Sequence, residues 1–132
     1  MIIDSSAFLA ILLGEAEQED ICLLIEEDTK SIMSVASYLE ISIKIHNMHD
    51  AELISVIDEI LNELGITLML VSVEQALIAR EAHKKFGKGM GHPARLNFGD
   101  CFSYALAKEM DLPLLFKGDD FIYTDLKLIR AE

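Results

Sequence analysis

The chain has 132 residues, of which 52% are hydrophobic and 26% charged, and its formal net charge at pH 7 is −12. This length suits one domain, residues 1–132, that buries a core without disulfides or structural metals. The negative charge argues against non-specific binding to a polyanion, because phosphate contacts need Lys or Arg. Cys22 and Cys101 lie in apolar runs without metal-ligand spacing, which favours reduced thiols and a cytoplasmic protein.

The apolar N-terminal run MIIDSSAFLAILLGE has no basic flank and carries Asp4 in its middle. It is therefore neither a signal peptide nor long enough to span a membrane. Residues 1–4 are expected to form a short buried strand that ends at Asp4. Ser5 or Ser6 can cap the helix that follows, which should end at Gly14.

The rest of the chain alternates helices and strands. Apolar periodicity and capping residues predict helices over residues 16–27, 35–46, 50–64 and 72–85, and short apolar runs predict strands over residues 31–34 and 66–71. A glycine-rich loop should cover residues 87–93. A helix with Asp100 in its first turn, a strand over residues 114–116 and an edge strand over residues 128–130 complete the chain. This order predicts an α/β fold whose mostly parallel central sheet is flanked by helices on both faces.

Four acids fall at one edge of this predicted sheet. Asp4 ends the first strand, and Asp120 lies in the turn after the strand over residues 114–116. Asp100 opens a helix at the same edge, and Glu40 lies on the helix that follows the second strand. Ligands of open α/β sheets collect outside the carboxyl ends of the strands, so these acids are expected to meet. Taken singly, Asp4 and Asp120 could instead cap helices or turns, Asp100 could be placed by the helix macrodipole, and Glu40 could point to solvent at a helix edge.

Carboxylates this close would repel and raise one another's pKa unless a cation lay between them. Oxygen ligands without Cys or paired His suit Mg²⁺, with Mn²⁺ as a substitute. Such a metal lowers the pKa of a bound water and stabilises charge on a leaving oxygen, which is the chemistry of phosphodiester hydrolysis. A phosphoacceptor domain or an aspartate-based phosphatase would need another acid close after Asp4, where Ser5 and Ser6 stand.

Four segments appear in a characteristic order along the chain. They are DSSA at residues 4–7, MSVASYLE at 33–40, KGMGHPARLNFGD at 88–100, and FKGDDF at 116–121 followed by Thr124 and Asp125. Together they resemble the PIN-domain family, specifically the VapC-type toxins of toxin–antitoxin pairs, and the resemblance runs essentially end to end.

The resemblance implies a PIN fold and a metal-dependent endoribonuclease that acts on tRNA, ribosomal RNA or messenger RNA. Its acidic metal site would comprise Asp4, Glu40, Asp100 and a fourth acid. Asp120 is preferred as the fourth because it directly precedes Phe121, and Asp119 is the alternative. Ser6 is a further candidate, for orienting a carboxylate or a metal-bound water, against a simple capping role.

One basic segment interrupts the acidic chain. Between residues 80 and 95 the only acid is Glu81, and the candidate RNA-contacting residues are Arg80, Lys84, Lys85, Lys88 and Arg95. The segment is either a solvated helix end and loop or a guide for the RNA backbone. The resemblance also implies a cognate antitoxin with a basic segment, and a homodimer. The rival hypothesis is a non-catalytic PIN-like module whose acids hold a basic partner peptide.

Overall fold

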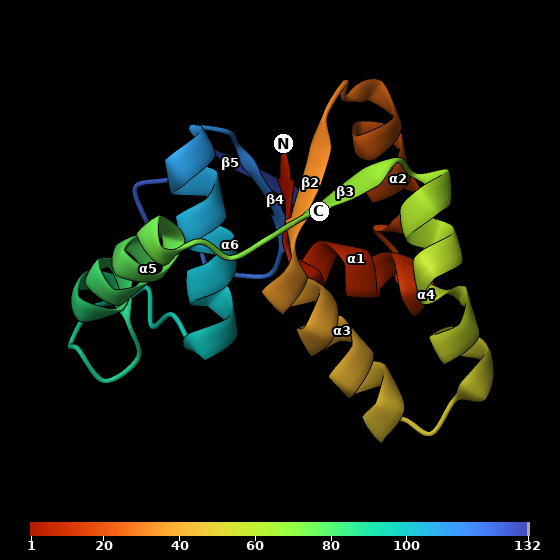
Figure 1. The fold of residues 1–132 in the computed structure, drawn as a ribbon, viewed down its shortest axis with the longest axis horizontal. Helices are drawn as coiled ribbons and strands as arrows, with labels where there is room; N and C mark the ends of the chain where they lie inside the picture. Colours follow the sequence, from red (N-terminus) through yellow and green to blue (C-terminus); the bar gives the residue numbers. More distant parts are fainter. Residues whose placement is uncertain (132) are drawn as a thin grey trace.

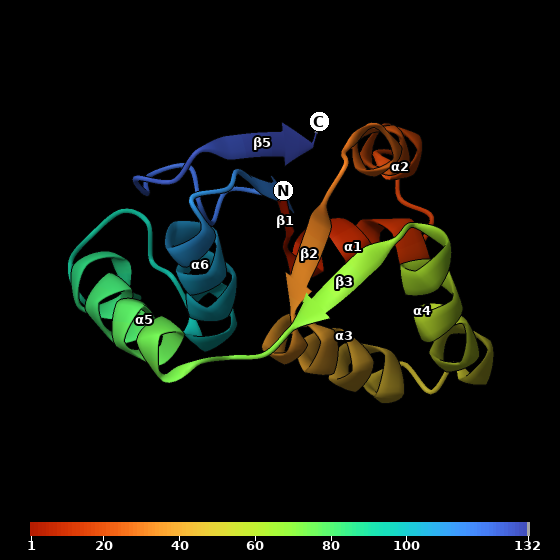
Figure 2. The same ribbon diagram turned by 45° about the horizontal axis from the view of Figure 1, so that its top comes forward.

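A five-stranded sheet forms the centre of the molecule, whose computed structural model describes residues 1–131 (Figures 1 and 2). Its strands are β1 (Ile2–Ile3), β2 (Ser31–Ser34), β3 (Ile66–Met69), β4 (Leu114–Lys117) and β5 (Leu128–Ala131), in the spatial order β3-β2-β1-β4-β5. Every neighbouring pair is parallel. The carboxyl ends of β1, β2 and β4 therefore meet at one edge, and the predicted α/β fold is confirmed.

Six helices within residues 1–131 cover the two faces of the sheet. They are α1 (Ser5–Leu12), α2 (Gln18–Glu27), α3 (Val35–Asn47), α4 (Ala51–Glu63), α5 (Val73–Phe86) and α6 (Phe98–Met110). Figure 1 shows α1 to α4 on one side of the sheet and α5 with α6 on the other. No helix in this described part of the chain is long and apolar enough to cross a membrane.

Neighbouring residues of each inner strand point into opposite cores, as the two-residue period of a strand requires. The core against α1 to α4 receives Ile3, Met33 and Leu115. The core against α5 and α6 receives Ile2, Ile32, Leu114 and Phe116. Because both faces are covered, these strands have no solvent-facing side. Each such side chain contributes roughly 1.5–3 kcal/mol to stability when fully buried. Cys22 packs on the first core and Cys101 lies in the second.

Capping side chains set most helix starts. Three helices begin where the sequence predicted within one residue, and their N-caps are the side chains of Ser34, Asp50 and Ser72. The expectation that Ser5 or Ser6 caps α1 is wrong. Asp4 is the cap, because its Oδ2 accepts a hydrogen bond from the backbone N–H of Ser6 at 3.1 Å. The residue that ends β1 therefore also starts α1.

Two other predicted boundaries shift by two residues. Helix α2 begins at Gln18 and not at residue 16, because residues 16–17 form a turn. Glu17 occupies the N-cap position but makes no side-chain capping hydrogen bond. Strand β3 ends at Met69, two residues early, and Leu70 is exposed beyond it. Both shifts leave the order of the elements unchanged.

Candidate active site

Asp4 lies at the end of β1 with a fixed carboxylate. It is only 3% exposed. Its Oδ1 accepts a hydrogen bond from Ser103 Oγ of α6 at 2.6 Å, and its Oδ2 accepts one from Ser6 Oγ at 2.6 Å. Ser6 Oγ in turn accepts from the backbone N–H of Lys117 at 3.0 Å, which ties the ends of β1 and β4 together. Ser6 thus orients the Asp4 carboxylate.

Asp100 stands in the first turn of α6, as predicted, and is 8% exposed. It forms a reciprocal capping box with Asn97. The Asn97 Oδ1 accepts from the Asp100 backbone N–H at 2.8 Å, and the Asp100 Oδ2 accepts from the Asn97 backbone N–H at 3.0 Å. Asp100 therefore also caps its own helix, through the Oδ2 atom of the carboxylate.

Glu40 reaches the same edge from α3. Its Oε1 accepts a hydrogen bond from Ser5 Oγ at the start of α1. The side chain lies directly against the backbone of Gly99 on α6, where an added Cβ would be 2.9 Å from the Glu40 Cδ and closer still to its Oε2. Glycine at position 99 therefore makes room for the Glu40 carboxylate next to Asp100.

The two acids of the turn after β4 have different neighbours. Asp119 forms an ion pair with Arg130 of β5. Burial raises the pKa of Asp120, the negative charges of Asp4 and Asp119 raise it further, and Lys44 of α3 lowers it. Asp120 is thus within electrostatic reach of Asp4, whereas Asp119 has its own cationic partner.

The acids of the cluster raise one another's pKa and, in the described chain, have no close cationic partner. Burial raises the pKa of Asp100 to about 7, against a hydrogen bond from Asn97 that lowers it, and the charges of Asp4, Asp120 and Glu40 add to the rise. Within residues 1–131, none of these four carboxylates forms an ion pair. A proton or a metal ion would therefore bind here more favourably than at an isolated carboxylate.

The chemistry of the donors fits a hydrated divalent ion. All of them are hard oxygens, the ligands that Mg²⁺ and Mn²⁺ prefer. In the described chain, no three His, Cys, Asp or Glu side chains are arranged to hold a metal ion. An ion that takes one or two carboxylates directly and keeps several waters matches this spacing better than one enclosed by the protein.

The predicted RNA-contacting residues divide into two groups. Lys88 and Arg95 line a cavity of about 330 Å³ together with Asp100, Asp119 and Asp120. The remaining three basic residues, all on α5, are not among the residues that line this cavity: Arg80, Lys84 and Lys85. The structure therefore brings the loop part of the basic segment to the acids and leaves the helical part away from them.

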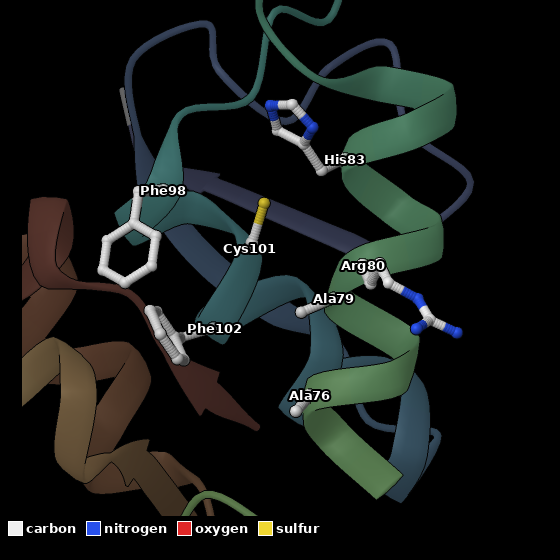
Figure 3. Close-up of a pocket in the computed structure, with 7 residues that line it drawn as sticks. All are labelled: Ala76, Ala79, Arg80, His83, Phe98, Cys101 and Phe102. Atoms are coloured by element: carbon white, nitrogen blue, oxygen red, sulfur yellow. The ribbon is translucent and has the colours of Figure 1, made fainter. Parts of the chain in front are cut away.

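A second cavity, of about 480 Å³, lies between α5 and α6 and is mostly apolar. Figure 3 shows Phe98 and Phe102 side by side on α6, with the guanidinium of Arg80 on α5 pointing away from them. The two rings meet edge to face at 4.9 Å between centroids, and Phe98 is 82% exposed. None of the four clustered acids lines this cavity, which is an apolar surface feature.

Two residues beside the cluster have structural partners elsewhere. Lys117 forms ion pairs with Glu15 and with Glu17, the latter at 3.1 Å, so its ammonium is turned towards the loop before α2. Asp125 accepts a hydrogen bond from the hydroxyl of Tyr104 at 2.6 Å, which joins α6 to the segment before β5. Both residues hold elements together.

Sequence reasoning missed several residues that support the acids. The spacing of Asn97 and Asp100 is that of a capping box and could have been recognised. Ser103 lies one turn after Asp100, on the same helix face, which is a weaker signal. The contacts of Ser5 with Glu40 and of Glu40 with Gly99 depend on how closely three helices approach, so no local pattern marks them.

Comparison with known proteins identifies the family. Residues 1–127 match the PIN domain. Ribonuclease VapC42 of Mycobacterium tuberculosis is 40% identical over 127 residues, which cover 96% of this chain and 97% of the relative. A toxin–antitoxin complex from Klebsiella pneumoniae contains a chain of similar fold, with a TM-score of 0.73 and 14% identity over 97% of this chain and 94% of that chain. Mycobacterium tuberculosis VapC20, described as a sarcin–ricin loop cleaving toxin, has a TM-score of 0.73 and 15% identity over 96% of this chain and 98% of its own. The chain therefore belongs to the PIN-domain family, and within it to the VapC ribonucleases.

Proposed function

We propose that this protein is a metal-dependent endoribonuclease that acts in the cytoplasm as the toxin of a toxin–antitoxin pair. The observation that carries the proposal is the gathering of four carboxylates, none of which forms an ion pair within residues 1–131, at the carboxyl edge of the sheet around the buried Asp100. Relatives named as ribonucleases and a relative described as cleaving the sarcin–ricin loop support the activity. A relative found in a toxin–antitoxin complex supports the biological role.

Asp4 and Asp100 are the proposed metal ligands, with Glu40 and Asp120 holding water around the ion. Mg²⁺, or Mn²⁺ in its place, lowers the pKa of a bound water and stabilises the charge on the leaving oxygen when it is present. The hydroxyls of Ser6 and Ser103 keep the Asp4 carboxylate in one orientation. The carboxylates at the rim can accept the proton that the attacking water loses.

The substrate in this proposal is RNA with unpaired nucleotides, whose backbone can enter an open cleft. Lys88 and Arg95, on the wall of the acidic cavity, would neutralise its phosphates. Water attacks the phosphorus and the bond to the 3′-oxygen breaks, so no covalent enzyme intermediate is needed and the products carry a 5′-phosphate and a 3′-hydroxyl. A 2′,3′-cyclic phosphate product would contradict this chemistry, because it requires attack by the ribose 2′-hydroxyl.

The proposed protein partners follow from two surfaces. An acidic cluster whose carboxylates form no ion pair among the described residues suits an Arg or Lys from an antitoxin, which would occupy the place of the metal or substrate. Exposed apolar side chains on α3 and α6 suit a second copy of the chain: Leu39, Ile43 and Phe98. A homodimer formed there would cover the apolar patch beside Glu40.

The test is cleavage of total tRNA and ribosomal RNA by antitoxin-free protein. Reactions contain Mg²⁺, Mn²⁺ or EDTA, and the variants are Asp4→Asn, Asp100→Asn and Asp120→Asn. Asp119→Asn is the matched control, because it alters a neighbouring acid that is paired with Arg130. We expect discrete fragments that require the metal, that disappear with the first three variants and that persist with the control.

Sequencing the fragment ends would name the target and the terminal chemistry. Cleavage that survives EDTA would contradict the metal site, and equal loss in Asp119→Asn and Asp120→Asn would contradict the assignment of the fourth acid. Absence of cleavage, together with no Mn²⁺ binding by calorimetry, would favour the non-catalytic module that holds a basic partner peptide.

A further inference from the structure

We propose that Tyr123, Lys88 and Arg95 form a nucleotide subsite beside the acids, in which one nucleobase stacks on the tyrosine ring while its phosphate contacts the two cations. The proposal rests on the proposed function, since it takes RNA as the ligand. It assigns a base-contacting role to a residue outside every motif of the sequence.

The first support is the composition of one cavity. Tyr123 lines the cavity of about 330 Å³ together with Lys88, Arg95 and three acids, Asp100, Asp119 and Asp120. The cavity thus presents an aromatic ring, two cations and acids in a space large enough for a small ligand. An apolar ligand would not use the charges, and a bare ion would not use the ring. A nucleotide uses the ring for its base and the cations for its phosphate, and the acids beside them belong to the proposed metal site.

The second support is the way in which the tyrosine is presented. Tyr123 is 55% exposed, although the turn that carries it is anchored. Phe121 is fully buried and meets Phe116 edge to face, with 5.5 Å between the centroids. The backbone N–H and the hydroxyl of Thr124 both donate to the Phe121 carbonyl, at 3.0 and 2.7 Å. Tyr123 is therefore held out on a fixed turn, so little conformational entropy is lost when a base stacks on it.

The third support is the architecture of the basic loop. Its two ends are joined, because Lys88 N–H donates to the Leu96 carbonyl and Leu96 N–H donates to the Phe86 carbonyl, each at 2.8 Å. Leu96 and Ala94 are buried on either side of the exposed Arg95. These contacts hold Lys88 and Arg95 next to one another at the cavity wall.

Arg95 has a left-handed backbone, with a φ of 54°. Residues other than glycine adopt this conformation uncommonly, and it costs energy unless the surroundings enforce it.

Within residues 1–131, neither Lys88 nor Arg95 takes part in an ion pair. Both charges are therefore available to a phosphate.

The charges of the cavity also bear on whether RNA or a basic peptide binds there. A phosphodiester pairs with the two cations of the cavity wall, whereas a basic side chain pairs with the acids and leaves both cations without a partner. Aromatic rings are the usual platforms for unpaired bases in RNA-binding proteins. The position of Tyr123 beside Asp120 makes the stacked base a neighbour of the bond that would be cut, so this subsite would influence which base is accepted there.

The test measures binding separately from cleavage. All proteins carry Asp100→Asn and are titrated in Mg²⁺ with a fluorescein-labelled single-stranded RNA of mixed sequence, and with an abasic ribose-phosphate chain of the same length. The variants are Tyr123→Ala, Tyr123→Phe and Lys88→Glu. Lys84→Glu is the matched charge control, because this exposed lysine lies on α5 and does not line the cavity.

We expect Tyr123→Ala to weaken RNA binding on the order of tenfold, the size of one base–aromatic stack, and to leave abasic binding unchanged. Tyr123→Phe should bind like the parent, because the ring remains. Lys88→Glu should weaken binding of both ligands and reduce the salt dependence, by more than Lys84→Glu does.

Three outcomes would overturn the subsite: equal loss of RNA and abasic binding in Tyr123→Ala, no loss in either, or no RNA binding by the parent protein. Tyrosine-dependent loss of affinity for a synthetic Arg-rich peptide, without loss for RNA, would also overturn it and would assign the cavity to the antitoxin. Tyrosine-dependent RNA binding by a chain that cleaves no RNA would support the subsite while the nuclease proposal fails.

Discussion

At the scale of single residues, Asp100 serves both the fold and the proposed chemistry. One carboxylate oxygen completes the capping box of α6, while its charge lies among three other acids. Burial and these neighbours raise its pKa, so the folded protein binds a proton more tightly than the unfolded chain does. The ionised, metal-free site therefore destabilises the fold.

This leads to a prediction for Asp100→Asn in EDTA. The folded pKa of about 7 exceeds the ordinary value of 3.8, so the favourable contribution of the protonated group is complete below pH 3.8 and is lost as the pH rises through 7. Asparagine can still accept the capping bond and carries no charge. The variant should gain stability over the wild type as the pH rises, on the order of 2 kcal/mol at pH 8.

Thermal unfolding at pH 5 and pH 8 measures this difference. Asp119→Asn is the control, because that acid is exposed and paired with Arg130 and should give no gain that grows with pH. A wild type that is more stable than Asp100→Asn at pH 8 in EDTA would mean that the carboxylate is already compensated.

Gly99→Ala gives a second prediction at this scale. The added Cβ would displace the Glu40 carboxylate, whereas alanine favours the helix by about 1 kcal/mol over glycine. We expect unchanged or higher thermal stability together with RNA cleavage reduced to the level of Glu40→Gln. Wild-type cleavage by Gly99→Ala would show that the position of Glu40 is unimportant.

The acids themselves could be found from the sequence, because each follows or opens an element at one sheet edge. Asp4 and Asp120 follow short apolar strands, and Asp100 opens a helix. Their supports could not be found in this way. Ser103 meets Asp4 and Gly99 meets Glu40 only because α6 packs across β1 and α3, and such distances are a property of packing.

At the scale of elements, helix α6 positions the Asp100 carboxylate and the glycine beside Glu40. Its N-cap Asn97 holds the backbone N–H of Asp100, and the same turn carries Gly99. Loss of this cap should therefore disturb both the helix end and the carboxylate that follows it.

The prediction compares Asn97→Ala with Ser72→Ala, which removes the equivalent cap of α5. Each variant should lose about 1 kcal/mol of unfolding free energy, the usual cost of an N-cap. Only Asn97→Ala should also lower the rate of RNA cleavage, because Ser72 lies away from the acids. Denaturant unfolding and single-turnover cleavage measure the two effects, and equal rates for both variants would contradict the role of the cap.

The order of the elements could be predicted from the sequence because helices and strands follow different apolar periods. The boundaries of the elements were predicted less accurately. Local capping chemistry decided them. Asp4 took the cap expected of Ser5 or Ser6, since its carboxylate reaches the backbone N–H of the residue two positions later. The sequence alone also did not divide the basic segment into its helical part and its loop part. That division depends on the pairing of residues 87 and 96, which closes the loop.

At the scale of the whole molecule, apolar surface beside the acids predicts self-association. Phe98 is 82% exposed at the start of α6, near the exposed Leu39 and Ile43 of α3. Phe98→Glu should convert the proposed dimer into a monomer, which sedimentation velocity would show. Leu70→Glu is the control, because this residue is 77% exposed but follows β3 on another part of the chain. A monomeric wild type would contradict the prediction.

The parallel sheet and its two helical layers could be predicted from the alternation of elements. The spatial order of the strands could not, because it depends on which crossover each helix makes. That order places β1 between β2 and β4, and so brings the residues after all three strands to one place.

The hydrogen bond between Ser103 and Asp4 joins residues that are 99 positions apart. Contacts of such long sequence separation form late, because a long chain must first close on itself. The proposed catalytic acids extend from position 4 to position 120, so an incomplete chain still emerging from the ribosome cannot assemble them. Under the proposed function, the chain would therefore gain its RNA-cleaving activity only when its synthesis is nearly complete. Its activity in urea should vanish together with global unfolding and not before it.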